Sequence, residues 1–306
     1  MCIIIMAQTK KGDKKMKKTL ALLMTLALAV GCLTAIAGCG KTGFDDSKNI
    51  SVVTREDGSG TKSAFMDIIG LKGQSDVSGV IVATGTAAVL QEVKGNPIAI
   101  AYESLGYVTD EVKILTVDGV EPSVANIKNG TYSIARPLNV VYKESSLEDA
   151  ANSAFLSYLQ SAEAQKIISD NGYVATKDGA AAYTVNAELS GEITISGSTS
   201  LKPLMEILAS EFMKIQSNVS VTVGGGGSGT GYNDAENGVT DFGMISEAFH
   251  TDKAPSCTYY EVAKDGIAII VNTANPITDI TLNDLKNIYD VNAGDKAVIK
   301  WSDLSK

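Results

Sequence analysis

Residues 191–208 have the sequence GEITISGSTSLKPLMEIL, in which a strand, a tight turn and a helix follow one another. Polar and β-branched residues alternate over 192–196, as in a strand, and apolar residues recur over 204–208 at helical spacing. Between them, Gly197 precedes three hydroxyl residues, Ser198, Thr199 and Ser200. Backbone N–H groups, hydroxyls and the positive end of a helix dipole converge there, which predicts an anion-binding turn. A simple helix cap at Ser198 or Thr199 is the alternative.

A second strand–turn–helix unit begins with NISVVT, which has the pattern of a buried strand. The turn that follows, REDGSGT at residues 55–61, places the hydroxyls of Ser59 and Thr61 at the start of a helix. Arg55 adds a permanently charged, planar guanidinium that suits tetrahedral oxyanions, and Asp57 is expected to brace it. Two similar turns in one chain favour an anion site over isolated helix caps.

A third glycine-rich turn, GGGGSGTG at residues 224–231, follows a predicted strand. It lacks the Lys-Ser/Thr pair that a nucleotide-binding phosphate loop carries after its last glycine, because Tyr232 and Asn233 stand there. The glycines instead predict a close approach of backbone N–H groups to a ligand, with Ser228 as a further donor.

Glu247 follows the predicted strand 241–245 and is a carboxylate among the expected anion-binding donors. Such a group repels an anion unless the ligand brings a proton to donate, as hydrogen phosphate does and sulfate does not. A glutamate near Arg55 would therefore select phosphate over sulfate. A solvated loop carboxylate is the alternative that stays open.

Strands and helices alternate from residue 48 onward, which predicts an α/β architecture with parallel sheets. The apolar spacing over 155–170 predicts one helix that ends before Gly172. A strand is expected over 266–271 and a further helix over 282–289.

The chain of 306 residues is long enough for two domains, and 44% of its residues are hydrophobic. Its net charge of −9 disfavours nucleic acid and anionic lipid as partners, so an anion must be held by local donors. His250 is the single histidine of the sequence and stands in a polar stretch, FHTDKAP. We therefore expect no Ser-His-Asp triad and no Cys/His metal cluster, and neither a metal nor a cofactor.

The N-terminal residues 1–38 have the features of an export signal, with lysines up to Lys18 and a short apolar run over 20–33. Small residues precede Cys39 as in a bacterial lipobox, which predicts lipidation of Cys39, with palmitate among the acyl groups, and removal of everything before it. An uncleaved anchor helix is the alternative, and both place the protein on the outer side of the membrane. Met16 is a more natural start than Met1.

Five segments together resemble the phosphate-binding lipoproteins of phosphate ABC transporters, which have a periplasmic-binding-protein type II fold. These segments are ISGSTSLKPL, VTVGGGGSGTGY, TDFGMISEA, AKDGIAIIVN and VVTREDGSGT. In typical members the GSTS segment precedes the REDGSGT segment, whereas here the order is reversed. The sequence therefore resembles a circular permutation whose junction is the polar connector 177–190. A fragment of a longer tandem protein is the alternative.

The resemblance implies two α/β lobes with a ligand cleft between them and a hinge where the chain crosses between lobes. It makes residues 39–47 a tether, 48–112 with 276–306 lobe A, and 113–275 lobe B. The family's phosphate contacts, with Glu247 standing where many members have Asp, correspond here to Arg55, Ser59, Gly60, Thr61, Thr199, Ser200, Ser228 and Glu247, supported by Asp57 and Ser198.

The function implied by the resemblance is capture of inorganic phosphate at the outer face of the cell membrane and its delivery to the permease subunits of an ABC transporter. The protein would be a monomer anchored through Cys39, with no enzymatic activity. Alternatives are a binding protein for another tetrahedral oxyanion, such as sulfate, molybdate or tungstate, and a phosphate-binding surface sensor without a permease. A phosphate-ester hydrolase using Ser59 or Ser200 is a third, which the lack of a nearby base disfavours.

Overall fold

The computed structural model describes residues 44–305. The predicted signal peptide, the lipidation site Cys39 and the first part of the tether therefore lie outside the described residues. Within the described range, the strands form one mixed sheet with the order β2-β1-β3-β10-β5-β9-β7-β8, to which β4, β6 and β11 are added at the sides. None of the helices in this range is long and apolar enough to cross a membrane.

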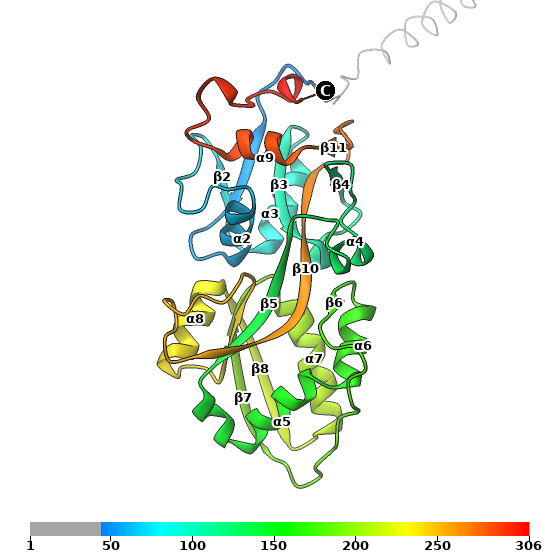
Figure 1. Ribbon diagram of the computed structural model, residues 1–306, viewed down its shortest axis with the longest axis vertical. Helices are drawn as coiled ribbons and strands as arrows, with labels where there is room; N and C mark the ends of the chain where they lie inside the picture. Colours follow the sequence, from blue (N-terminus) through cyan, green and yellow to red (C-terminus); the bar gives the residue numbers. More distant parts are fainter. Residues whose placement is uncertain (1–43, 306) are drawn as a thin grey trace, which may run out of the picture. The chain divides into compact units, whose positions relative to one another are not determined.

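Two lobes divide this sheet between them (Figure 1). The elements of the first lobe are β1 (Ser51–Arg55), α2 (Gly60–Ile68), β2 (Ile81–Ala83), α3 (Thr86–Gly95), β3 (Ala99–Ser104), β4 (Val112–Val117), α4 (Val124–Lys128), β11 (Asp279–Ile280) and α9 (Leu282–Tyr289). The elements of the second lobe are β5 (Ala135–Tyr142), α5 (Ala150–Leu159), α6 (Ala162–Asp170), β6 (Val174–Ala175), β7 (Gly191–Gly197), α7 (Lys202–Ile215), β8 (Val219–Gly226), α8 (Ser228–Asn237) and β9 (Phe242–Ile245).

The long strand β10 (Thr258–Asn272) belongs to both lobes. Its first part pairs antiparallel with β5 over Thr258 to Gly266, and its last part pairs antiparallel with β3 and β4. The chain thus crosses between the lobes at the start of β5 and again within β10, as Figure 1 shows. The predicted strand 266–271 is only the buried end of this element, because the more exposed half lacks a continuous apolar run.

The predicted α/β two-lobed fold is confirmed, but its sheet is mixed and not purely parallel. β1 pairs parallel with β2 and β3, and β7 pairs parallel with β8 and β9. β5 and β10 run against their neighbours because both strands connect the lobes in opposite directions. Sequence patterns identify strands more readily than their partners, which lie far away in the chain.

Separate hydrophobic cores show which residues pack in which lobe. Phe65 and Tyr289 are buried in the first lobe together with Leu115 of β4, whereas Phe155 and Phe212 are buried in the second. β4 pairs with β10 and β11, and this pairing holds it in the first lobe.

The lobe boundary predicted at residue 113 therefore differs from the packing. Residues 113–134, assigned to lobe B from the resemblance, bury Ile127 and Ile134 in the core of the first lobe. The end of β10 does the same with Ile269 and Val271. By this packing, the crossings lie near Ala135 and Gly266.

The single helix predicted over 155–170 is two helices, α5 and α6. Ser161 is the N-cap of α6, since its Oγ accepts a hydrogen bond of 3.3 Å from the Ala164 N–H. A serine side chain that satisfies the free donors of a new first turn interrupts a helix even where apolar spacing continues.

Segments near the two ends of the described chain lie together. The rings of Phe44 and Trp301 have centroids 5.6 Å apart, and the Ser302 N–H donates to the Asp46 carbonyl at 3.0 Å. This proximity satisfies the geometric condition of the predicted circular permutation, in which these segments would be continuous. The permutation itself stays a prediction.

Candidate anion-binding site

A small polar cavity lies where the two lobes meet, closed so tightly that no space the size of a water molecule remains in it. Its lining is polar and consists of Arg55, Ser59, Gly60, Thr61, Ser198, Thr199, Ser200, Gly227, Ser228 and Ser246. The first lobe supplies the end of β1 and the start of α2, and the second supplies the turn before α7, the start of α8 and the residue after β9. Three helix N-termini thus meet at one cavity, where their free N–H groups and dipoles favour negative charge.

The turn that opens α2 is set by Gly58 and Ser59. Gly58 has φ +82°, a left-handed conformation that glycine adopts without steric cost. Ser59 is the N-cap, and its Oγ accepts a hydrogen bond of 3.3 Å from the Lys62 N–H. Gly60 and Thr61 are the first two helical residues, so their N–H groups have no partner within the helix.

The turn before α7 depends on Gly197 and Ser198. A Cβ at Gly197 would lie 2.3 Å from the Met244 carbonyl oxygen, and its φ is +127°, so only glycine fits. The Ser198 Oγ accepts a hydrogen bond of 3.1 Å from the Leu201 N–H. Ser198 therefore holds the turn closed, while Thr199 and Ser200 line the cavity with it.

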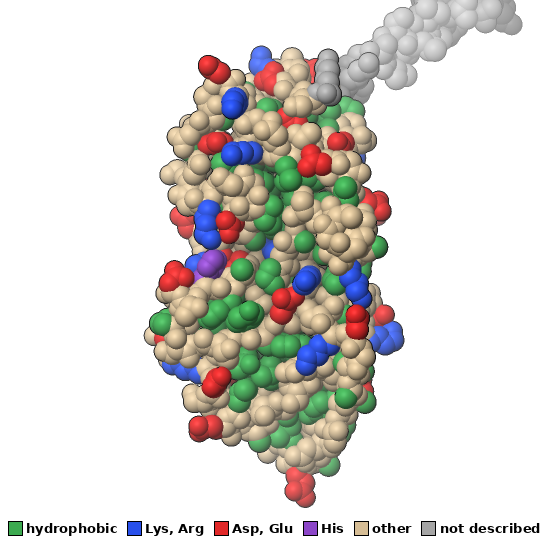
Figure 2. Space-filling view, in the orientation of Figure 1, with side chains coloured by type: hydrophobic (Ala, Val, Ile, Leu, Met, Phe, Trp, Pro, Cys, Tyr) green, Lys and Arg blue, Asp and Glu red, His purple; other side chains and the backbone are tan. Residues whose placement is uncertain are grey.

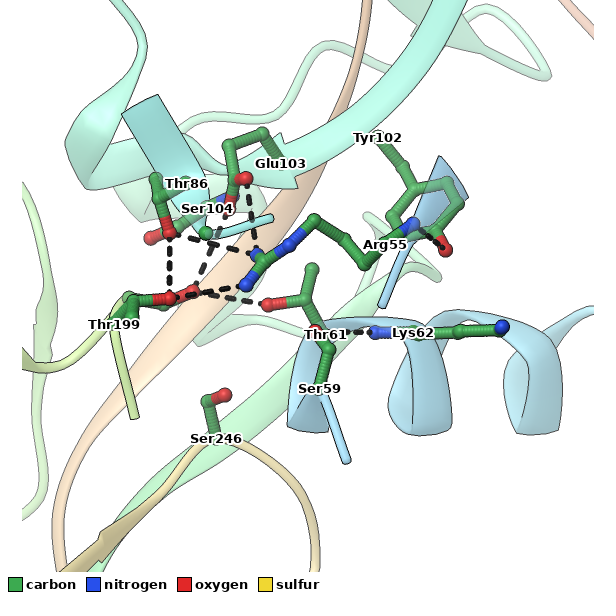
Figure 3. Close-up of polar contacts among 12 residues, drawn as sticks. Arg55, Ser59, Thr61, Lys62, Thr86, Tyr102, Glu103, Ser104, Thr199 and Ser246 are labelled. Carbon is green, nitrogen blue, oxygen red and sulfur yellow. Dashed lines mark hydrogen bonds and ion pairs between the residues drawn. The ribbon is translucent and has the colours of Figure 1, made fainter. Parts of the chain in front are cut away.

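Arg55 is the buried cation of the site, with 1% of its surface exposed. Its guanidinium donates to both carboxylate oxygens of Glu56 at 2.9 and 3.0 Å, and to Glu103 Oε2 at 3.3 Å. It also donates to Thr199 Oγ1 at 3.0 Å (Figure 3). Burial lowers the pKa of Arg55, but the hydrogen bond to Glu56 and the two carboxylate charges outweigh it and raise the pKa.

Hydroxyl groups from the two lobes bond directly to one another. Thr61 Oγ1 lies 2.9 Å from Ser200 Oγ, and Thr86 Oγ1 lies 3.1 Å from Thr199 Oγ1. In each pair either oxygen is able to donate, so these groups adapt to an acceptor or a donor on a ligand. The contacts bring the predicted site residues of both lobes to one place (Figure 3).

Glycines allow the two lobes to approach this closely. A Cβ at Gly60 would lie 2.2 Å from Ser228 Oγ and 2.8 Å from Ser246 Oγ, both of which belong to the opposite lobe. Beside it, the Gly229 N–H donates to the Gly58 carbonyl across the interface at 3.0 Å. The glycine pattern of both turns therefore serves a close interlobe fit.

Asp57 does not brace Arg55 as predicted. Its side chain is fully exposed and pairs with Lys62 at 3.0 Å, while the neighbouring Glu56 holds the guanidinium with two hydrogen bonds. The pKa of Glu56 is lowered, since the bonds and charge of Arg55 outweigh the effect of burial. Both acidic residues follow the end of β1 at Arg55, where strand alternation no longer applies, and the sequence alone does not say which one faces inward.

Glu247 is not brought to the cavity either. Its carboxylate is buried, and its Oε1 accepts a hydrogen bond of 2.8 Å from Lys253 Nζ. It lines a wider neighbouring cavity together with Asp57 and Lys62. Ser246, one residue earlier, occupies the lining position expected for Glu247.

Four residues of the site were not found from the sequence: Glu56, Thr86, Glu103 and Ser246. Thr86 follows Gly85 at the start of α3, a pattern that resembles the other two turns and that could have indicated it. Ser246 directly follows a predicted strand, which is a weaker signal. Nothing in the local sequence distinguishes Glu103 from an ordinary surface glutamate, although it is fully buried.

The surface around the site is mixed in charge. Figure 2 shows acidic and basic side chains interspersed over the visible face of the described residues. Across residues 44–305, no group of three or more His, Cys, Asp or Glu side chains is placed to hold a metal ion. The cavity is lined by neutral donors and the Arg55 guanidinium, groups that are able to bind an anion.

Two α/β lobes that enclose a buried guanidinium, paired hydroxyls and helix N-termini define a solute-binding protein for a small oxyanion. The PBP superfamily domain matches residues 10–163 and 181–305 of the chain. Phosphate-binding protein PstS 2 of Streptococcus agalactiae is 34% identical in an alignment 303 residues long that covers 96% of this chain and 100% of that protein. Phosphate-binding protein PstS 2 of Streptococcus pneumoniae is 33% identical in an alignment 250 residues long that covers 79% of this chain and 85% of that protein.

The structure is also similar to the crystal structure of a phosphate-binding protein of a phosphate ABC transporter from Streptococcus pneumoniae. The TM-score is 0.67 at 31% sequence identity, covering 84% of this chain and 100% of that one. This chain therefore belongs to the PBP superfamily and, within it, to the PstS family of phosphate-binding proteins.

Proposed function

We propose that this protein captures inorganic phosphate outside the cytoplasmic membrane and delivers it to an ABC permease. The observation that carries the proposal is the buried Arg55 guanidinium, bonded across the lobe interface to Thr199. A tetrahedral oxyanion with several acceptor oxygens matches a fork of N–H donors surrounded by hydroxyls. The relatives are phosphate-binding proteins, which makes phosphate the expected anion.

The proposed ligand contacts are the cavity-lining members of the predicted set, together with Ser246. They comprise Arg55, Ser59, Gly60, Thr61, Thr199, Ser200, Ser228 and Ser246, with Ser198 holding the turn. Backbone N–H groups at Gly60, Thr61 and Ser228 add donors that carry no charge. Most of these donors belong to helix starts, so an anion bound among them draws the lobes together.

A calorimetric titration tests the anion. The purified protein should bind phosphate with heat, and sulfate, molybdate and tungstate should bind much more weakly when titrated at the same pH and ionic strength. If sulfate bound as tightly as phosphate, the proposed ligand would be a broader class of oxyanions and not phosphate alone. Turnover of a chromogenic phosphate ester that is lost with Ser59→Ala or Ser200→Ala would instead favour a hydrolase.

We further propose that the chain is a monomeric lipoprotein at the outer face of the membrane, anchored through Cys39. Support comes from the sequence pattern of residues 1–39, which predicts an export signal followed by a lipidated cysteine. Palmitate labelling of the expressed protein should be lost in Cys39→Ser, and the variant should leave the membrane fraction. A surface sensor would bind phosphate equally well but would not restore phosphate uptake to cells that lack their own binding protein.

A further inference from the structure

Glu103 is a buried carboxyl that sits against the anion cavity without lining it. It lies near the end of β3, has no exposed surface, and accepts a hydrogen bond of 2.7 Å from the Ser104 N–H at Oε1. Oε2 accepts a hydrogen bond of 3.3 Å from Arg55 NH1 (Figure 3). A longer contact of 3.5 Å joins Oε1 to Ser200 Oγ. A carboxyl in this position responds directly to whatever binds Arg55 and Ser200.

Arg55 is shared between two carboxylates. Glu56 holds it with two short hydrogen bonds and is a quarter exposed, whereas Glu103 has one longer contact and no access to water. One guanidinium thus faces two negative charges when both carboxyls are ionised. The local charge is then negative before an anion arrives.

Other charged and titratable groups near Glu103 do not relieve this imbalance. Arg136 of β5 exerts a favourable charge on Glu103, but it already forms a buried ion pair of 3.1 Å with Asp265 of β10, whose charge opposes it. Tyr173, which precedes β6, is influenced by Glu103 and has a raised pKa because of burial, so it stays neutral. Burial raises the pKa of Glu103 itself, and the charge of Arg55 opposes that shift.

An anion that takes hydrogen bonds from Arg55 and the hydroxyls would add like charge within a few ångströms of Glu103. It would also compete with Glu103 for the same guanidinium. Both effects favour the neutral form of a carboxyl that has no water to solvate its charge. Glu56 retains its solvent contact and its two bonds, so the proton goes to Glu103.

We propose that anion binding at this site is coupled to uptake of a proton by Glu103, so that the ligand is held beside a neutral carboxyl. The inference rests on the proposed function, because it needs an anion in the cavity. It adds a titratable positioning residue to the set that contacts the ligand. Since the complex binds more protons than the free protein, phosphate affinity falls more steeply with rising pH than the ligand's own titration requires.

Calorimetry counts the protons. Phosphate is titrated into the protein at one pH in buffers with different ionisation enthalpies, and the slope gives the protons taken up per anion bound. Glu103→Gln, which keeps the shape and removes the ionisable group, should lower this count by at least about half a proton. Glu261→Gln is the matched control: Glu261 is a partly buried glutamate on β10, its pKa is also raised by burial, and it does not line the cavity. This variant should keep the proton count of the unaltered protein.

A second measurement needs no substitution. In the unaltered protein labelled with ¹³C at glutamate side chains, one Cδ resonance should move from the carboxylate to the carboxylic-acid position when phosphate is added near neutral pH. All glutamates remaining ionised in the complex would overturn the inference, as would equal proton counts for the unaltered protein and Glu103→Gln. Those results leave phosphate binding intact, whereas a protein that binds no phosphate in any buffer refutes the proposed function and the inference with it.

Discussion

Thr61 and Ser200 share a buried hydrogen bond of 2.9 Å, although 139 residues separate them in the chain and they belong to different lobes. Each is a member of a glycine-and-hydroxyl turn at the start of a helix. The bond therefore reports directly on whether the two turns face one cavity. Both hydroxyls are also placed to bond an anion in that cavity.

Removal of either hydroxyl should weaken phosphate binding without unfolding the protein. Thr61→Val or Ser200→Ala leaves the partner hydroxyl and the ligand with one bond fewer in a buried site, a cost of about 1–3 kcal/mol. Phosphate affinity should fall roughly 5- to 150-fold in calorimetry. Thr222→Val, at an exposed position of β8, is the control and should bind as the unaltered protein does. Unchanged affinity in both site variants would mean that the turns do not hold the ligand.

Arg55 should dominate affinity because it is the buried cation of the site. Arg55→Ala removes the buried positive charge that is placed to contact the ligand, at a cost of about 2–5 kcal/mol. Phosphate affinity should therefore fall by a factor between about 30 and several thousand. Arg55→Lys keeps the charge but loses the planar fork, and it should recover only part of the loss. A loss under ~0.5 kcal/mol in Arg55→Ala, the scale of an exposed pair, would contradict the proposed role.

The glycine at position 60 offers a test of lobe closure. In Gly60→Ala the new Cβ would lie 2.2 Å from Ser228 Oγ, so the lobes should be kept apart while each lobe stays folded. Phosphate affinity should fall at least tenfold, about 1.4 kcal/mol, with little change in the thermal unfolding midpoint. Gly95→Ala is the matched control, because a Cβ there meets no atom within 4 Å. Equal phosphate affinity in Gly60→Ala and Gly95→Ala would show that the interface between the lobes accommodates the added methyl group.

The sequence allowed the turns to be predicted because their determinants are local. Gly197, Ser198 and Ser59 specify their own backbone through left-handed conformations and caps, so the strand–turn–helix units appear where expected. Helix α9 also coincides with its predicted range, 282–289. These features need no knowledge of the rest of the fold.

The charge partners of Arg55 depended on tertiary structure and were predicted less well. Asp57 and Glu56 are neighbours in sequence, and only the direction of the chain after β1 decides that Glu56 faces the guanidinium. Glu103 comes from β3, which pairs with β1, and no pattern around it signals its burial. The partners of Arg55 that were not predicted are therefore placed by contacts between segments far apart in the sequence.

Cys257 gives a pH-dependent prediction outside the site. Burial, and then the hydrogen bond and charge of Glu236, raise the pKa of this thiol to about 11 from 9.0. Because only the thiolate is nucleophilic, at pH 9 about one hundredth of the molecules should carry it, compared with half for an ordinary thiol. Alkylation of the Cys257 peptide, followed by mass spectrometry, should therefore be slow at pH 8 and rise up to about pH 11. Glu236→Gln should move this profile to lower pH, and a profile centred near 9 in the unaltered protein would contradict the burial seen here.

The buried pair Arg136 and Asp265 connects the lobe crossing with the anion cavity. The two residues face each other on β5 and β10 at 3.1 Å, and Arg136 NH1 also donates to the Ser246 carbonyl at 3.1 Å. The Ser246 N–H in turn donates to Ser228 Oγ at 3.0 Å, so the pair orients two residues of the cavity lining.

Replacement of this pair should affect the free energy of unfolding and the affinity for phosphate differently. Asp265→Ala leaves a buried, unpaired guanidinium and should lower the free energy of unfolding by about 3–5 kcal/mol in denaturant titrations. The double replacement Arg136→Met with Asp265→Leu should recover most of that stability, because no charge is left buried without a partner. It should still bind phosphate less tightly, since the Ser246 carbonyl loses its donor.

The control is Asp178→Ala, which breaks the exposed pair with Lys128. It should cost under about 1 kcal/mol and leave binding unchanged. Full phosphate affinity in the stable double variant would show that the ion pair supports the fold alone and does not position Ser246.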